Sequence, residues 1–160
     1  MAEIIIPDPE INTNPWRRYT YSSEGIRLLI PSQLSHEGIT PQTHPQVVDL
    51  CAGDGSIARI LADNGWSLSI ITCIDKLVSP TPLVEGVRWL YWDLRELAKS
   101  VIGDVSLPTE VVKKRNSFDV VCLWSGIDED ETKNIGWLER KIICDFFVKP
   151  TGYISTDVLN

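Results

Sequence analysis

The residues of this chain whose types and spacing could do chemistry gather around a short loop that contains two glycines. Gly53-Asp54-Gly55 follows the apolar run 47–50 and precedes residues 56–64, whose apolar side chains recur at helical spacing. Glycine lets the backbone turn tightly and lets a ligand approach without a Cβ in the way. The start of the helix that follows offers free N–H groups. The pattern therefore predicts a ligand-binding turn between a strand and a helix.

Three aspartates, Asp49, Asp75 and Asp93, stand at or near the ends of successive apolar runs. Ligands of parallel α/β sheets bind at the carboxyl ends of the strands, where these side chains would gather. Asp75 lies 20 residues beyond Gly55. A carboxylate there suits a ribose diol, because it accepts both hydroxyl protons. The competing interpretation is a structural tight turn with solvent-facing acids; the combined pattern favours binding.

The elements that must position these residues alternate between strands and helices. We expect strands at 47–50, 68–74, 87–91, 118–123 and 153–158, and helices at 56–64, 94–102 and 135–148. The strands are continuous apolar runs, which is typical of a parallel sheet covered on both faces. The pattern predicts a doubly wound, Rossmann-like α/β domain over residues 46–160. Residues 1–45 hold six of the ten prolines and are expected to form an irregular arm with one short helical piece at 22–29.

Length and composition set the outer limits. The chain has 160 residues, of which 43% are hydrophobic, enough for one domain with a buried core. No run of 18 apolar residues is present, and residues 1–10 do not read as a secretory signal. The four cysteines form no close pair, so we expect buried, reduced thiols in a cytoplasmic protein and no metal site.

The net charge of −7 gives the chain no bulk field that would draw it to a phosphate backbone. Contact with RNA would need a local basic patch. The candidates are a cluster on the arm, Trp16, Arg17 and Arg18, and a run in the polar connection before residue 118, Lys113, Lys114 and Arg115. An ordinary packing role for the arm cluster is at least as well supported.

The loop residues 53–58 fit the dinucleotide pattern G-x-G-x-x-A as well as a loop that holds S-adenosylmethionine. Asp49 and Asp54 favour the latter. An acid at the helix start repels a pyrophosphate, whereas an acid at the strand end suits the ammonium of the methionine part. A dinucleotide-binding module remains an alternative interpretation of the same loop.

The run Val47-Val48-Asp49-Leu50-Cys51-Ala52-Gly53-Asp54-Gly55 resembles motif I of class I methyltransferases, and it is most similar to the form VDLCAAPGSW in FtsJ/RrmJ-type RNA ribose 2′-O-methyltransferases. The likeness continues in residues 80–87 (PTPLVEGV), in Trp92-Asp93-Leu94, in Phe118-Asp119-Val120-Val121-Cys122, and in Val148-Lys149-Pro150-Thr151-Gly152, which resembles the family's L-K-P-G-G turn. It covers residues 46–157 in order.

The resemblance implies a sheet of order 3-2-1-4-5 and a bound S-adenosylmethionine. Gly53 and Gly55 would cradle the methionine part, Asp75 would bind the ribose, and Asp93 with Leu94 would meet the adenine. Trp124, which ends a strand beside this site, could stack on a base. The candidate cofactor-binding residues are Asp49, Cys51, Gly53, Asp54, Gly55, Asp75, Asp93, Leu94 and Trp124.

The family's catalytic Lys-Asp-Lys-Glu tetrad is not matched. Its first three positions fall on Arg27, on Trp124 (or Ser125 with a one-residue slip) and on Asp157, and the fourth falls beyond Asn160. Arginine keeps the charge of a lysine but cannot act as a base. Two further interpretations therefore stand beside methyl transfer to RNA: a different acceptor, and a catalytically silent domain that acts as a scaffold. The sheet is also expected to be shortened at its C-terminal end, with an edge that a protein partner would cover.

Overall fold

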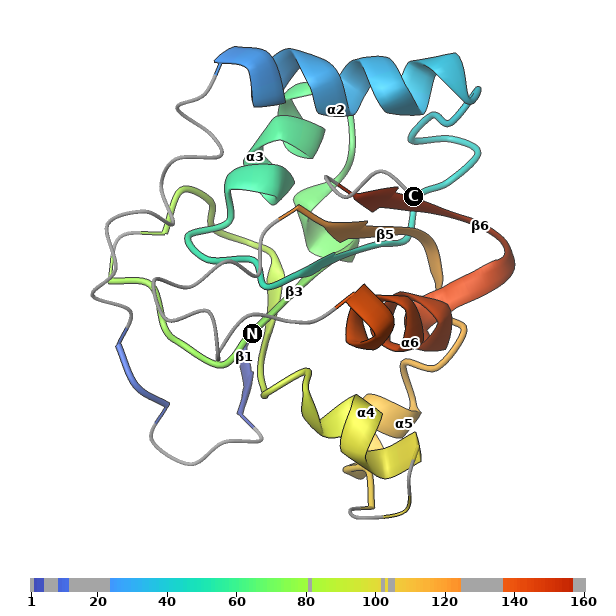
Figure 1. The fold of residues 1–160 in the computed structure, drawn as a ribbon. Helices are drawn as coiled ribbons and strands as arrows, with labels where there is room; N and C mark the ends of the chain where they lie inside the picture. Colours follow the sequence, from blue (N-terminus) through green and yellow to red (C-terminus); the bar gives the residue numbers. More distant parts are fainter. Residues whose placement is uncertain are drawn as a thin grey trace.

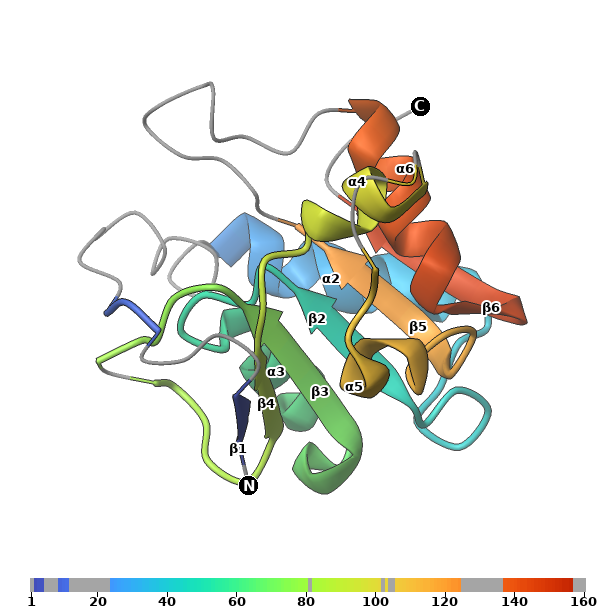
Figure 2. The ribbon, with the colours of Figure 1, turned by 90° about the horizontal axis from the view of Figure 1, so that it is seen from below.

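The computed structural model describes residues 2–4, 9–11, 24–80, 82–101, 103, 106–124 and 137–156. In this part of the chain six strands form one parallel sheet in the order β1-β4-β3-β2-β5-β6 (Figures 1 and 2). Their bounds are β1 Ala2–Ile4, β2 Val47–Leu50, β3 Ile71–Asp75, β4 Arg88–Tyr91, β5 Phe118–Leu123 and β6 Val148–Thr156. The five strands from β2 onward have the order 3-2-1-4-5, which confirms the predicted Rossmann-like α/β sheet and its strand order.

Helices cover both faces of the sheet (Figure 2). One face carries α2 (Glu24–His36) and α3 (Ser56–Asp63). The other carries α4 (Glu96–Val101), α5 (Thr109–Val112) and α6 (Trp137–Phe147). A short 3-10 turn, η2 (Leu68–Ile70), leads into β3. The predicted helices at 56–64, 94–102 and 135–148 correspond to α3, α4 and α6, whereas α5 lies in a segment that the pattern predicts as a polar connection.

Successive strand residues point to opposite faces, so the sheet divides the core into two clusters. Val47, Cys73 and Val120 belong to the cluster under α2 and α3. Val48 and Val121 belong to the cluster under α4, α5 and α6. This alternation explains why the central strands are mostly apolar on both faces, since both faces are buried.

The N-terminal arm contains two regular elements where an irregular segment was expected. β1 pairs in parallel with β4, with Ala2 opposite Trp89, and so adds a strand to one edge of the sheet. The helix α2 is longer than the predicted piece and continues through Pro31. Ile30 and Leu34 of this helix are fully buried in the core with α3. Burial of this apolar face outweighs the hydrogen bond that proline cannot donate.

The segment predicted as a turn, residues 149–152, belongs to β6. The register shifts there: Phe118 pairs with Val148, whereas Val120 pairs with Tyr153, so β6 holds extra residues opposite β5. Gly152 sits in this bulge. A Cβ at Gly152 would lie 2.6 Å from Val148 Cγ2 and 2.9 Å from the Asp119 carbonyl oxygen. Glycine therefore lets the bulged strand lie against the backbone of β5.

No helix in the described ranges is both long enough and apolar enough to cross a membrane. All four cysteines are free thiols, and Cys73, Cys122 and Cys144 are buried, as the sequence predicts.

We predict that Gly152→Ala lowers the free energy of unfolding by about 1–3 kcal/mol, because the added methyl group overlaps backbone atoms that cannot move cheaply. Urea denaturation measures the change. The matched control is Thr151→Ala at the exposed neighbouring position, for which we expect a change within about 0.5 kcal/mol. Equal denaturation midpoints for the two variants would contradict the role given to Gly152.

Candidate functional site

The glycine loop, residues 53–55, connects the carboxyl end of β2 to the first residue of α3. Three residues of this turn have positive φ: Cys51 at 57°, Gly53 at 61° and Gly55 at 89°. Gly55 is the N-cap of α3 in the left-handed conformation. A Cβ there would lie 2.8 Å from Val84 Cγ2. Backbone geometry and lack of space both require glycine at this position.

Asp75, the last residue of β3, ties this loop to the sheet. Its Oδ2 accepts the Gly53 N–H at 2.8 Å, and its Oδ1 accepts the Leu77 N–H at 3.0 Å. The residue is only 3% exposed. The structure thus places Asp75 beside the glycine loop, as the sequence predicts, with both carboxylate oxygens engaged by backbone donors. A ribose diol bound here would have to compete with these donors.

Asp49 and Asp54 are buried beside Asp75, with exposures of 1% and 2%. One carboxylate oxygen of each, Oδ2, has no hydrogen-bond partner within the described residues. The Ser56 hydroxyl donates to the other Asp54 oxygen. Asp49, Asp54 and Asp75, which we call the acidic cluster, therefore hold two orphaned oxygens in a site that excludes water, and such groups are costly to leave unsatisfied.

The surroundings of Asp49 disfavour its charge. Burial raises the pKa of Asp49 well above its usual range, and the charges of Asp75 and Asp54 raise it further. Its neighbours across the sheet are Cys73 and Cys122. Burial raises the pKa of both thiols as well, with Asp49 as the next cause, so neither supplies a compensating charge.

A cover segment, residues 82–87, lies over the glycine loop. The Leu83 N–H donates to the Asp54 carbonyl oxygen at 2.7 Å. Val84 is buried, and its side chain takes the space that a Cβ of Gly55 would fill. Access of a ligand to the glycine loop therefore requires this segment to move. The sequence pattern did not predict this cover, whose local signal is the apolar pair Leu83-Val84 between Pro82 and Gly86.

Asp93 and Leu94 make their described contacts with residues outside the acidic cluster. Asp93 is held by Arg95, whose Nε donates to Oδ1 at 3.1 Å and whose guanidinium Nη2 donates to Oδ2 at 2.9 Å. Burial raises the pKa of Asp93, but the hydrogen bonds from Arg95 outweigh it, and the net shift is downward. Leu94 is a buried member of the core under α4, α5 and α6. Asp93 is thus a charged, half-buried carboxylate with an internal counterion.

Trp124, at the carboxyl end of β5, is buried and serves as a structural link. Its indole Nε1 donates to the Ser155 hydroxyl at 2.8 Å, and that hydroxyl donates to Gln33 Oε1. The chain of contacts joins β5, β6 and α2. One of the two positions to which the sequence resemblance assigns a catalytic aspartate thus holds a hydrogen-bonded indole. Sequence reasoning missed Ser155 and Gln33, because nothing local marks either as its partner.

Of the other sequence-predicted residues, Arg27, Lys113, Lys114 and Arg115 belong to the described part of the chain. Arg27 is exposed near the start of α2. Asp157, Ser125 and the arm cluster Trp16, Arg17 and Arg18 lie outside the described residues. Lys113, Lys114 and Arg115 follow α5 and precede the first residue of β5. Because the strands are parallel, that position is at the amino ends of the strands, opposite the glycine loop.

In the described ranges, no group of three or more His, Cys, Asp or Glu residues is arranged to hold a metal ion. The acidic cluster has two orphaned oxygens but not the convergence of ligands that a metal ion needs. An organic cation with N–H donors matches it better, since such a group can donate to each oxygen separately.

Twelve solved chains match this fold. One is a SAM-dependent methyltransferase from Archaeoglobus fulgidus, with 16% sequence identity and a TM-score of 0.48, covering 88% of this chain and 57% of that chain. Another is a protein from Pyrococcus horikoshii OT3, with 18% identity and a TM-score of 0.49, covering 89% of this chain and 62% of that chain. This chain therefore spans about three fifths of their length. No protein-family model and no curated protein matches the sequence.

We predict that Asp49→Asn stabilises the protein increasingly as the pH rises above about 4. The pKa of Asp49 is raised in the folded state, so the unfolded chain loses its proton first, and the wild-type carboxyl costs stability above the unfolded value of about 3.9. The amide has the same shape and no charge. We expect a gain of about 1–3 kcal/mol at pH 8 that shrinks toward pH 4, measured by urea denaturation across this range.

The control for this comparison is Asp63→Asn, which removes an exposed carboxylate from α3. We expect it to change stability by less than about 0.5 kcal/mol at each pH. An Asp49→Asn protein that is less stable than the wild type at pH 8 would contradict the conclusion that this carboxyl is strained by its surroundings.

Proposed function

We propose that this chain binds S-adenosylmethionine at the glycine loop and acts as a methyltransferase, with RNA as its acceptor. The observation that carries the proposal is the acidic cluster, whose two orphaned carboxylate oxygens are buried against the start of a helix. Such oxygens lower the stability of the fold unless a ligand forms hydrogen bonds with them. The fold itself, a parallel sheet of order 3-2-1-4-5 with a glycine turn after its first central strand, supports a nucleotide ligand at this edge.

The residues present fit this cofactor. Asp49 and Asp54 would receive the N–H donors of the methionine ammonium, which supplies the positive charge that the acidic cluster lacks. Asp75 would bind the ribose hydroxyls, exchanging one or both of its backbone donors for them. Gly55 leaves room for close approach once Val84 withdraws. When bound, the cofactor supplies a sulfonium methyl group, for whose transfer the positioning of the acceptor contributes much of the rate.

The choice of RNA as acceptor rests on the resemblance of the sequence motifs to FtsJ-type ribose methyltransferases. The departure at Arg27 and Trp124 removes a lysine and a carboxylate that such chemistry uses. An acceptor that is more acidic or more nucleophilic than a ribose hydroxyl would need less assistance. Methyl transfer to total RNA and to protein, followed with a labelled methyl group, compares the acceptor classes directly.

We predict that S-adenosylhomocysteine binds the wild-type chain in calorimetric titration, that Asp75→Ala weakens this binding at least tenfold, and that Val84→Ala strengthens it. Loss of the ribose contacts weakens binding, whereas a smaller residue at position 84 makes the cover segment easier to displace. The two variants thus shift affinity in opposite directions, which a general loss of stability would not produce.

The matched control is Leu83→Ala, in the same cover segment, because its side chain is partly exposed and its backbone N–H is retained. NAD serves as the competing ligand, since a dinucleotide-binding module would prefer it. The absence of any S-adenosylhomocysteine binding, or tighter binding of NAD, would reject the proposed cofactor.

A second candidate, a catalytically silent scaffold, is favoured by the contacts of Trp124. The resemblance implies a catalytic carboxylate at Trp124 or Ser125, and the indole of Trp124 instead links three elements through Ser155 and Gln33. On this view the domain retains the fold and uses the same edge of the sheet for structure alone. Binding of S-adenosylhomocysteine without methyl transfer to any acceptor would support a silent domain that retains its cofactor.

We predict that Trp124→Phe lowers the free energy of unfolding by about 1–3 kcal/mol and leaves the affinity for S-adenosylhomocysteine within twofold of the wild type. The variant removes the Nε1 donor and leaves the Ser155 hydroxyl without it, while the ring stays apolar. Denaturation and calorimetry of the same preparation measure both quantities. A tenfold loss of affinity with unchanged stability would instead place Trp124 in contact with the cofactor.

A further inference from the structure

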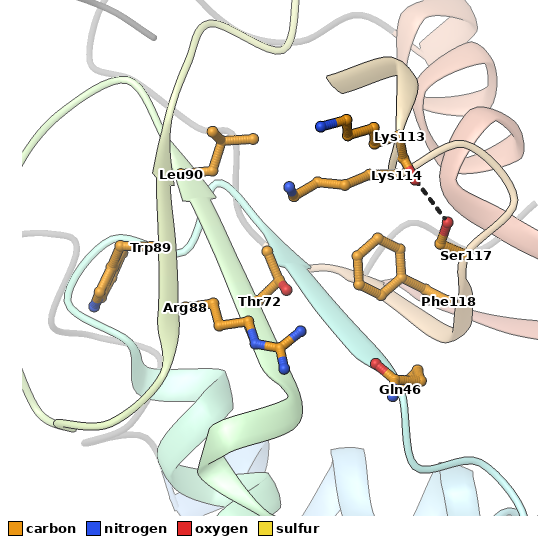
Figure 3. Close-up of a pocket in the computed structure, with 9 residues that line it drawn as sticks. All are labelled: Gln46, Thr72, Arg88, Trp89, Leu90, Lys113, Lys114, Ser117 and Phe118. Atoms are coloured by element: carbon orange, nitrogen blue, oxygen red, sulfur yellow. Dashed lines mark hydrogen bonds between the residues drawn. The ribbon is translucent and has the colours of Figure 1, made fainter. Parts of the chain in front are cut away.

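A cavity of about 190 Å³ opens at the amino ends of the central strands, on the sheet face that carries α5 (Figure 3). Its lining residues come from the starts of four strands and from the turn after α5: Gln46, Thr72, Arg88, Trp89, Leu90, Lys113, Lys114, Ser117 and Phe118. The cavity lies at the opposite end of the strands from the glycine loop, so it is a separate site.

Three of the nine lining residues are cations and none is an acid. Figure 3 shows the Lys113 and Lys114 amines extending from the α5 side toward β4, and the Arg88 guanidinium extending from β4 toward Gln46. The Lys114 amine also donates to the Glu110 carbonyl oxygen at 3.3 Å. Neither Arg88 nor Lys113 belongs to an ion pair among the residues that the structure describes. The cavity is therefore a local basic site on an acidic chain.

A carboxylate that contacts one of the lining residues, Asp119, already has a cationic partner. Asp119 accepts the backbone N–H of Gln46 at 2.9 Å and forms an ion pair with the Lys149 amine at 3.1 Å. The third member of the basic run is directed elsewhere, since the Arg115 guanidinium lies over the Phe146 ring, 5.9 Å from its centroid. Of the three consecutive basic residues, Lys113 and Lys114 thus line the cavity, whereas Arg115 contacts Phe146.

We propose that this basic cavity binds a phosphomonoester, the terminal phosphate of a small sugar phosphate or of an RNA 5′ end. A phosphomonoester carries close to two negative charges at neutral pH and several acceptor oxygens, which suits three cations that approach from two sides. A pocket of this volume admits a terminal group better than a continuous strand of backbone diesters. Gln46 and Thr72 add uncharged polar groups to the same wall, and Leu90 and Phe118 provide an apolar floor.

The test is calorimetric titration of the full chain with ribose 5-phosphate and with ribose, at fixed low salt. We expect ribose 5-phosphate to bind and ribose not to bind. A short RNA with a 5′-phosphate is then compared with the same RNA carrying a 5′-hydroxyl, which distinguishes a free sugar phosphate from an RNA end as the source of the phosphate. Equal affinity of the two RNAs together with no binding of ribose 5-phosphate would overturn the proposal, because it would indicate a diffuse polyanion surface.

Variants assign the binding to the cavity. We expect Arg88→Gln and the double variant Lys113→Gln, Lys114→Gln each to weaken ribose 5-phosphate binding by roughly tenfold or more, because each removes a charge-assisted contact. Arg115→Gln is the matched control: it removes the same charge from the same run but does not line the cavity, and it should change affinity by less than about twofold. Equal weakening by Arg115→Gln and Arg88→Gln would overturn the proposed site. The proposal is independent of the cofactor, since its ligands and variants do not involve the glycine loop.

Discussion

The hydrogen bond from the Gly53 N–H to the Asp75 carboxylate is the interaction on which the rest of the candidate site depends. It joins the end of β3 to the turn after β2, where the Ala52 N–H also donates to the Ile74 carbonyl oxygen. The hydrogen bond to Asp75 is buried, and a hydrogen bond shielded from water is electrostatically stronger than an exposed one. By holding the turn, Asp75 fixes the left-handed conformation of Gly55 and with it the starting point and direction of α3. The α3 face of the core is then built against that helix.

The same arrangement explains why this edge of the sheet is strained. Holding the turn with a buried carboxylate puts Asp75 beside Asp49 and Asp54, and the charge of Asp49 is disfavoured by both. The cover segment lowers the exposure of the cluster further, because the Leu83 N–H and the Val84 side chain close over the loop. Stability alone would favour uncharged side chains at these positions. A ligand that brings N–H donors and positive charge would relieve the strain, provided that its binding compensates for displacing the cover.

The sequence was most informative where burial leaves a local pattern. The central strands were predicted because both of their faces are buried. The glycine loop was predicted because Gly55 adopts a backbone conformation that other residues rarely adopt, at a position with no room for a side chain. Contacts between distant segments leave no such pattern. Three residues of β1 are too few to show a period, and their partner strand begins more than 80 residues later. The link from Trp124 through Ser155 to Gln33 spans 122 residues between its last two members, and Gln33 itself looks like any polar residue on a helix.

A net charge of −7 conceals a separation of charge along the strands. In a parallel sheet all carboxyl ends of the strands meet at one edge and all amino ends at the other. Charged residues at the same end of different strands therefore gather at the same edge of the domain. Here β3 ends in Asp75 whereas β4 begins with Arg88, and Lys113 and Lys114 lie at the amino edge as well. Four residue steps of β3 separate the edges by about 13 Å. The acidic cluster and the basic cavity thus lie at opposite edges of the sheet. If RNA is the acceptor, its phosphates must be kept away from the acidic cluster while one nucleoside reaches it, and an anchor at the amino edge would hold a different part of the same molecule.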